Sequence, residues 1–172
     1  GAGGPSAAQA TSDSAAAANG AAVATDTTSA NSAKALKAAG GVFITGGTFA
    51  VDSSDDSVHS NGTVTIDGGT FLMSSGDDGI HADATLTING AEIPVARSYD
   101  GLEASAITIN DGTIYVTASD DALNVAGGAD GSSTSGRPGQ NQFAANAGNK
   151  LTLNGGYLVV DSGGDGLDSN GT

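Results

Sequence analysis

The acidic residues of this chain return at a fixed interval, and the interval decides what chemistry they can do together. Five Asp residues share one phase of the repeat, at successive spacings of 22, 22, 21 and 44 residues: Asp56, Asp78, Asp100, Asp121 and Asp165. Three positions after each stands another oxygen or imidazole donor: His59, His81, Glu103, Asn124 and Asp168. A period near 22 is typical of a solenoid with one coil per repeat, so each set should form a column.

Stacked carboxylates repel one another, so such a column needs neutralising. Neighbouring coils lie about 4.8 Å apart, where two carboxylates repel by roughly 3 to 4 kcal/mol at an effective dielectric near 20. The chain has 17 Asp and two Glu, and several Asp come as adjacent pairs. Short carboxylates beside backbone carbonyls suit a hard cation with six to eight oxygen ligands, and calcium is the usual one outside cells. We therefore predict calcium between the coils.

Calcium is one of four ways to account for the columns. Asp is favoured in turns for local reasons, so the column could be turn chemistry alone. Protonation could relieve the repulsion by raising some carboxyl pKa values. Zinc could bind His59 and His81, although two imidazoles without a Cys or a third His make a poor zinc site. In addition, Lys34 and Lys37 lie 22 residues before Asp56 and His59, so both columns begin with a basic residue.

The apolar residues keep the same phase and predict the elements that hold these columns. Within each repeat they come in pairs two residues apart, which is the period of a strand. Glycines such as Gly46, Gly47 and Gly90 lie between the pairs, where they permit a bend. About 22 residues leave room for three short strands and three corners. We predict an all-β fold, a right-handed parallel β-helix with stacked aliphatic columns inside.

Composition limits the partners. The 172 residues include five Lys plus Arg against 19 Asp plus Glu, a formal net charge of −14, and no Cys. Nucleic acid and anionic membrane surfaces are therefore poor partners. No apolar run approaches membrane-spanning length. The chain lacks a starting Met and stops inside a repeat, so we expect a piece of something longer.

The chain divides into an extension and one solenoid. Residues 1–31 are rich in Ala, Ser, Thr and Gly and predict an N-terminal extension or loop that buries little. Residues 32–172 carry the repeat. Residues 127–149 account for the one 44-residue step and are rich in Gly and Ser, which indicates a loop inserted at one corner.

The repeats SDDSVHSNGTVTIDGGTF, SGDDGIHADATLTING, SYDGLEASAITINDGT and GGDGLDSNGT resemble the calcium-containing, carbohydrate-binding β-helix proteins of cellulolytic clostridia, whose fold is similar to family 9 pectate lyases. The resemblance covers residues 32–172, although the family's N-terminal coils are missing. It implies a secreted or surface-attached protein that binds cellulose and pectic polysaccharide and carries calcium at its Asp-rich corners. The calcium ligands it implies are Asp55, Asp56, Asp77, Asp78, Asp100, Asp120, Asp121, Asp165 and Asp168.

Sugar binding needs a surface, and aromatic residues are few. The candidates are Tyr99, Tyr115 and Tyr157, with Arg97 nearby in the sequence. An outward apolar row is also predicted: Leu72, Pro94, Tyr115 and Val159. With so few rings, we expect calcium-bridged uronate to be a more natural mode of binding than ring stacking.

Rival functions remain at this stage. A pectate-type lyase would need a base, for which Lys34 and Arg97 are candidates, but surrounding carboxylates keep a Lys protonated. Head-to-tail stacking into a filament would pair Lys34 and Lys37 of one copy with Asp165 and Asp168 of the next. Ice binding by a row of outward Thr residues is a third possibility, although Thr is common on strands in any case. The row is Thr65, Thr87, Thr108 and Thr152.

Overall fold

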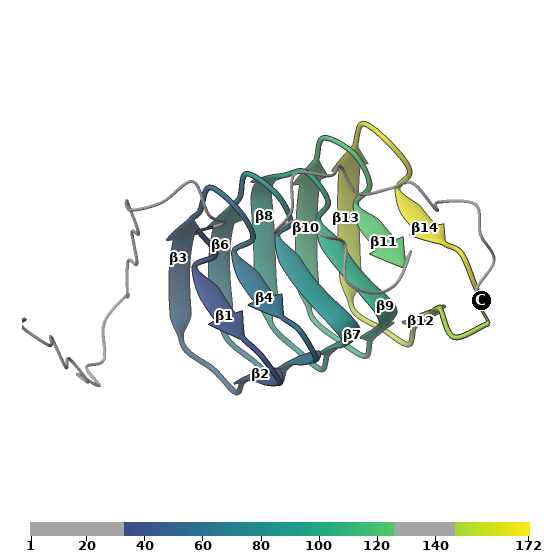
Figure 1. Cartoon of the computed structure of the whole chain (residues 1–172), viewed down its shortest axis with the longest axis horizontal. Coiled ribbons are helices and arrows are strands. Elements are labelled where there is room, and N and C mark those ends of the chain that lie inside the picture. The colour runs from purple at the N-terminus through teal and green to yellow at the C-terminus, as the bar shows by residue number, and fades with distance from the viewer. Residues whose placement is uncertain (1–32, 126–146) are drawn as a thin grey trace, which may run out of the picture.

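The computed structural model describes residues 33–125 and 147–172. These residues form strands and turns, and no helix occurs among them. Strands of successive coils lie side by side and pair in parallel along one axis (Figure 1). The predicted parallel β-helix is confirmed.

Each coil contributes to three faces. Face one contains β1 (Leu36–Ala38), β4 (Val58–Ser60), β11 (Leu123–Val125) and β14 (Leu167–Ser169), with the first parts of β7 (Ile80–Ile88) and β9 (Leu102–Ile109). Face two contains β2 (Gly41–Ile44), β5 (Thr63–Ile66) and β12 (Lys150–Leu153), with the remainders of β7 and β9. Face three is a separate five-stranded sheet: β3 (Thr48–Asp52), β6 (Thr70–Ser74), β8 (Glu92–Ser98), β10 (Thr113–Ala118) and β13 (Tyr157–Ser162).

The register follows the sequence repeat. On face one, Leu36 pairs with Val58, and the same phase continues through the coils to Leu167. Because a shift of one residue would turn every apolar side chain outward, the alternation fixes this register. The face-one column is Leu36, Val58, Ile80, Leu102, Leu123 and Leu167.

The aliphatic columns form one continuous core. Ile80, Ile88 and Ile107 have no exposed surface, and fully burying such a side chain stabilises the fold by roughly 1.5 to 3 kcal/mol. The rings of Phe49 and Phe71 stack with centroids 4.8 Å apart. Since each coil packs only on its neighbours, this core positions the corner residues at a regular spacing.

The corner between faces two and three needs glycine. Gly47, Gly69, Gly112 and Gly156 have φ between 91° and 126°, a conformation that side chains rarely adopt. A Cβ on Gly112 would also lie 2.9 Å from the carbonyl oxygen of Ala91. The predicted glycine bend is therefore confirmed at four corners.

Two predicted segments fall outside the described residues. They are the extension, residues 1–31, and the inserted loop, residues 127–149, of which the last three residues are described. In the part of the chain that is described, no helix is long and apolar enough to span a membrane.

Candidate metal centre and outer face

The Asp residues of the repeat stack at the corner between faces three and one, and we call them the Asp column: Asp56, Asp78, Asp100, Asp121 and Asp165. In each coil the Oδ1 atom accepts the backbone N–H of the Asp in the next coil. The four N···O distances are 3.1, 3.3, 2.9 and 2.6 Å. One oxygen of Asp56, Asp78, Asp100 and Asp121 therefore satisfies a backbone donor of the next coil. These bonds join residues 21 to 44 positions apart, so the local turn chemistry considered from the sequence does not account for that oxygen.

The residues three positions further on form a second column beside the first, which we call the partner column: His59, His81, Glu103, Asn124 and Asp168. Three of its members, His59, His81 and Asn124, bind the second oxygen of an Asp in the column. His59 Nδ1 lies 2.6 Å from Asp56 Oδ2, and Asn124 Nδ2 donates to Asp100 Oδ2 at 2.8 Å. The identity of this second residue decides how each carboxylate is neutralised.

Basic residues fill the N-terminal part of the columns, which we call the basic half: Lys34, His59 and His81. The Lys34 ammonium, whose side chain is 1% exposed, lies 2.9 Å from Asp55 Oδ1 and 2.7 Å from Asp56 Oδ2. Burial opposes charge on both partners, yet hydrogen bonds from His59 and Lys34 hold the pKa of Asp56 at about 2. Burial also opposes charge on Lys34, but its bonds to Asp56 and Asp55 raise the Lys34 pKa. The predicted basic start of the Asp column is confirmed.

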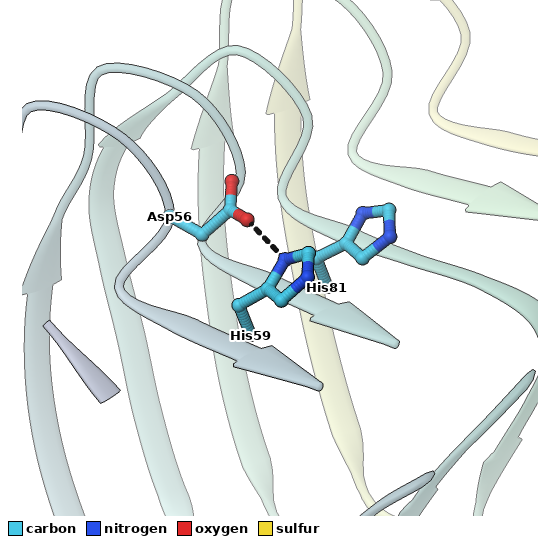
Figure 2. A group of neighbouring side chains, drawn as sticks. All are labelled: Asp56, His59 and His81. Carbon is cyan, nitrogen blue, oxygen red and sulfur yellow. Dashed lines mark hydrogen bonds and ion pairs between the residues drawn. The ribbon is translucent and has the colours of Figure 1, made fainter. Parts of the chain in front are cut away.

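His81 is surrounded by carboxylates. Its Nδ1 lies 3.1 Å from Asp78 Oδ2 and 3.1 Å from Glu103 Oε2, while Nε2 lies 3.0 Å from Asp83 Oδ1. Burial would lower the His81 pKa, but hydrogen bonds and charges from Asp78 and Glu103 raise it to about 12. The ring stacks on that of His59, with centroids 4.8 Å apart and planes 9° from parallel. Figure 2 shows the two rings on adjacent strands, with Asp56 bonded to His59.

Beyond Glu103, which His81 binds, the C-terminal part of the columns has no such basic residue within the described ranges. We call this part the acidic half: Glu103, Asn124, Asp168 and the Asp residues beside them. Burial raises the pKa of Asp100 to about 7 despite its hydrogen bonds, and the charges of Glu103 and Asp121 add to the shift. Burial also raises the pKa of Asp121, helped by the charges of Asp120, Asp168 and Asp165. These carboxylates therefore lie close enough to repel one another.

An unsatisfied oxygen lies in this acidic half. Asn124 is 4% exposed, and its Oδ1 has no hydrogen-bond partner within residues 33–125 and 147–172. A buried carbonyl oxygen without a donor or cation costs about 1 to 3 kcal/mol, so this oxygen is available to a hydrogen-bond donor or a cation. Two positions that the sequence placed in the partner column, Glu103 and Asn124, were not among the predicted calcium ligands. The column spacing was the signal that could have included them.

The predicted calcium ligands do not all meet at one place. Asp55, Asp56 and Asp77 offer oxygen atoms within 4.8 Å of one another, but Lys34 already binds the first two. Asp78 and Asp100 are buried, and Asp165 is exposed at the last described coil. Asp120 and Asp168 lie near Asp121 by their effect on its pKa. Their role as calcium ligands stays a prediction.

A second row of polar side chains lies at the corner between faces two and three. It was not predicted from the sequence. Asn89 Nδ2 donates to Asp67 Oδ1 at 2.7 Å, and Asn110 and Asn154 continue the chain of side-chain bonds at 2.6 Å each. All four residues are exposed. The repeat of Asn at spacings of 21 and 44 residues was the available signal.

The outer surface of face three carries the predicted apolar row. Leu72 is 55% exposed and Tyr115 is 43% exposed, and strand pairing aligns Pro94, Tyr115 and Val159. Tyr157 is 59% exposed and meets Tyr115 edge to face, with ring centroids 6.0 Å apart. We call this surface the outer row: Ala50, Leu72, Pro94, Tyr115 and Val159, with Tyr157 beside it.

The other two candidates for sugar contact lie away from its centre. Arg97 is at the end of β8, where it binds Asp52 Oδ1 at 3.4 Å in an exposed ion pair. Tyr99 is half-buried at the corner, and its backbone pairs with Asp77 and Asp120. The structure therefore brings together Tyr115 and Tyr157 but not Tyr99.

These features define a class: a parallel β-solenoid with a buried polar column at one corner and a flat outer sheet that presents apolar side chains. A family model described as "carbohydrate-binding domain-containing protein" matches residues 4–79 and 78–122. The chain belongs to this carbohydrate-binding domain family. No curated protein matches the chain, and no solved structure does.

Proposed function

We propose that the chain is a secreted or cell-surface, non-catalytic module that binds polysaccharide along the outer row and holds calcium at its acidic half. The observation that carries the proposal is the alignment of Leu72, Pro94, Tyr115 and Val159 on one flat sheet, in a chain of the carbohydrate-binding family. Sugar rings present apolar C–H faces, which pack on such a surface.

Charge around the outer row favours a neutral glycan such as cellulose. Asp52, Glu92 and Asp161 are exposed on the same sheet, and the Arg97 guanidinium is already paired with Asp52. An acidic surface repels a polyuronate. A chain of neutral sugars would meet no such repulsion.

The uronate mode expected from the sequence finds little support in this geometry. Four carboxylates of the Asp column are at most 5% exposed, and one oxygen of each already accepts a hydrogen bond from a backbone N–H: Asp56, Asp78, Asp100 and Asp121. Calcium held by these residues would lie inside the corner, away from an arriving uronate. Its role would be to join coils.

The acidic half fits calcium better than the basic half does. The charges of Asp120, Asp168 and Asp165 act on Asp121 with no cation from the described part of the chain beside them, and Asn124 Oδ1 offers a neutral ligand of the kind calcium takes. In the basic half, the Lys34 ammonium already neutralises Asp55 and Asp56. We therefore assign the proposed ion to Asp121, Asp168 and Asn124, with Asp120 and Asp165 near them.

Neither base considered for lyase chemistry is suited to that role. Lys34 is buried with a raised pKa, so it stays protonated. Arg97 is exposed in its pair with Asp52, and a guanidinium stays charged in proteins. The Lys34 contacts also bear on head-to-tail stacking, because its ammonium is engaged within its own chain.

Binding to insoluble polysaccharide tests this proposal. Wild-type protein should bind cellulose and bind polygalacturonate less, and Tyr115→Ala and Tyr157→Ala should each weaken cellulose binding by roughly tenfold. Phe43→Ala is the matched control, because Phe43 is 74% exposed but lies on β2 in face two. Equal loss in all three variants, or no binding by wild-type protein to any polysaccharide tried, would overturn the assignment of the outer row.

A further inference from the structure

Asp78, His81 and Glu103 form a compact triangle of three different ligand groups. Asp78 and His81 come from one coil, and Glu103 comes from the partner column of the next. All three side chains are buried, and His81 has no exposed surface. One donor atom from each lies within 4.8 Å of the other two.

The distances in this triangle suit a metal ion with short bonds. His81 Nδ1 lies 3.1 Å from both Asp78 Oδ2 and Glu103 Oε2. Imidazole and carboxylate ligands bind zinc at about 2.0 to 2.2 Å, so two neighbouring ligand atoms around the ion lie roughly 3.0 to 3.5 Å apart. The triangle is therefore already near the spacing of three coordinated atoms.

The triangle also places two carboxyl groups around one imidazole nitrogen. Asp78 and Glu103 belong to adjacent coils, and a metal ion bound between them would replace the proton on His81 Nδ1. The His81 Nδ1 faces an oxygen of each. A divalent ion in this position would neutralise both carboxylates at once.

The far side of the ring provides a separate indication. His81 Nε2 lies 3.0 Å from Asp83 Oδ1. A metal-bound imidazole commonly donates its other N–H to a carboxylate, which fixes the ring and strengthens it as a ligand. Asp83 is placed to do this for His81.

We propose that Asp78, His81 and Glu103 bind a divalent transition-metal ion of the zinc class. The imidazole ligand separates this site from the proposed calcium site, because calcium prefers oxygen ligands alone. It also differs from a zinc ion shared by His59 and His81. Their rings are 9° from parallel at 4.8 Å, and an imidazole lone pair lies in the plane of its ring, so both cannot point at one ion without turning.

Cobalt and zinc titrations test the site without any variant. Because the triangle is buried, the metal is supplied both to the folded protein and during refolding. We expect one equivalent of Co²⁺ to give ligand-field absorption bands that Zn²⁺ removes and excess Ca²⁺ does not. The chain has two His, so nitrogen-labelled imidazole signals identify the ligand directly, and the His81 signals should shift on adding zinc. No bands at stoichiometric cobalt after refolding, or bands that calcium removes, would overturn the proposal.

Variants then locate the ion. His81→Asn and Glu103→Asn should each weaken Co²⁺ binding at least 100-fold, and Asp83→Asn should weaken it roughly 10- to 100-fold. His59→Asn is the matched control, since it makes the same change one coil earlier and should leave binding intact. If His59→Asn weakens Co²⁺ binding as much as His81→Asn does, the ion is shared by the stacked pair His59 and His81, and the triangle is not the site. Circular dichroism checks that each variant folds, and the wild-type imidazole spectrum decides the question if one does not.

Discussion

The two halves of the polar corner are built on the same backbone and neutralised in different ways. In both, an Asp Oδ1 accepts the N–H of the next coil. In the basic half, Lys34 and His81 bring positive charge to these carboxylates, and His59 hydrogen-bonds Asp56. In the acidic half, the same position of the repeat holds Glu103, Asn124 and Asp168, and the pKa of Asp100 rises to about 7.

The difference shows which residue carries the adaptable chemistry. The Asp column is fixed by the turn, because every coil has the same backbone donor to satisfy. No backbone donor has to be satisfied by the partner column, so its positions can hold an acid, an amide or a base. A solenoid of this kind can therefore acquire or lose an ion site by changing one partner residue per coil.

The largest effect is expected from removing the cation of the basic half. Lys34→Met should destabilise the protein by about 3 to 5 kcal/mol, because it leaves Asp55 and Asp56 buried without their ammonium partner. Urea unfolding measures the change. Lys37→Met, at an exposed position on β1 three residues later, should stay within about 0.5 kcal/mol. Similar small changes for both variants would show that the Lys34 ammonium is not needed to neutralise the buried carboxylates of the basic half.

Calcium should act on the acidic half alone. At a concentration 100 times its dissociation constant, calcium bound only by the native state would add about 2.7 kcal/mol, or roughly 5 to 10 °C in melting temperature. Thermal melts with calcium and with chelator measure it. The shift should shrink in Asp168→Asn and Asn124→Leu but persist in Asp67→Asn, which changes the second row of polar side chains. A melt indifferent to chelator in wild-type protein contradicts the calcium assignment.

Asp100 should contribute to the pH dependence of stability when calcium is absent, in the same direction as Asp78 and Asp121, whose pKa values burial also raises. Its folded pKa of about 7 lies above the unfolded value near 3.9, so the unfolded chain ionises first as pH rises. Stability should fall from about pH 4 to pH 7, by up to about 1.4 kcal/mol per pH unit, and change little from this group above pH 7.

Asp100→Asn tests that origin. The amide oxygen can still accept the N–H of Asp121, and the unsatisfied Asn124 Oδ1 gains a possible donor if that side chain turns. The variant should therefore show a flatter stability profile between pH 4 and 7 in chelator-treated samples. An unchanged slope would place the titrating group elsewhere in the corner.

The smallest change in stability is expected from a substitution that gives the basic half a residue type of the acidic half. His59→Asn places in the basic half the residue type found at position 124. Asn124 donates to Asp100 of the preceding coil, whereas His59 bonds Asp56 of its own coil, so the new amide would have to donate to Asp56 over three residues. We expect a loss of about 1 kcal/mol, from the shorter side chain and the lost stack on His81. A loss as large as that of Lys34→Met would mean that the imidazole charge, and not its hydrogen bond, supports Asp56.

Much of the site could be predicted because the repeat fixes register. The phase of Leu36, Val58 and Ile80 placed each strand, and the same arithmetic put Lys34 beside Asp56. The contacts within the corner could not be obtained in this way. A column position says that His81 neighbours Glu103, but it does not say that one nitrogen meets two carboxylates while the other meets Asp83.

The sequence by itself determined the solenoid, its columns and its acidic character, because a repeat of about 22 residues with apolar pairs two apart leaves few other ways to bury those side chains. Only the tertiary structure decided how the charges are met. Stacking the coils buries the carboxylates side by side. The length and rotamer of each side chain then determine the distance between a carboxylate and the groups beside it. The residue type at each partner position, which the sequence gives, separates the basic half from the acidic half. The distances decide which atoms meet: Lys34 Nζ binds Asp56 Oδ2, whereas Asn124 Oδ1 has no partner among the described residues.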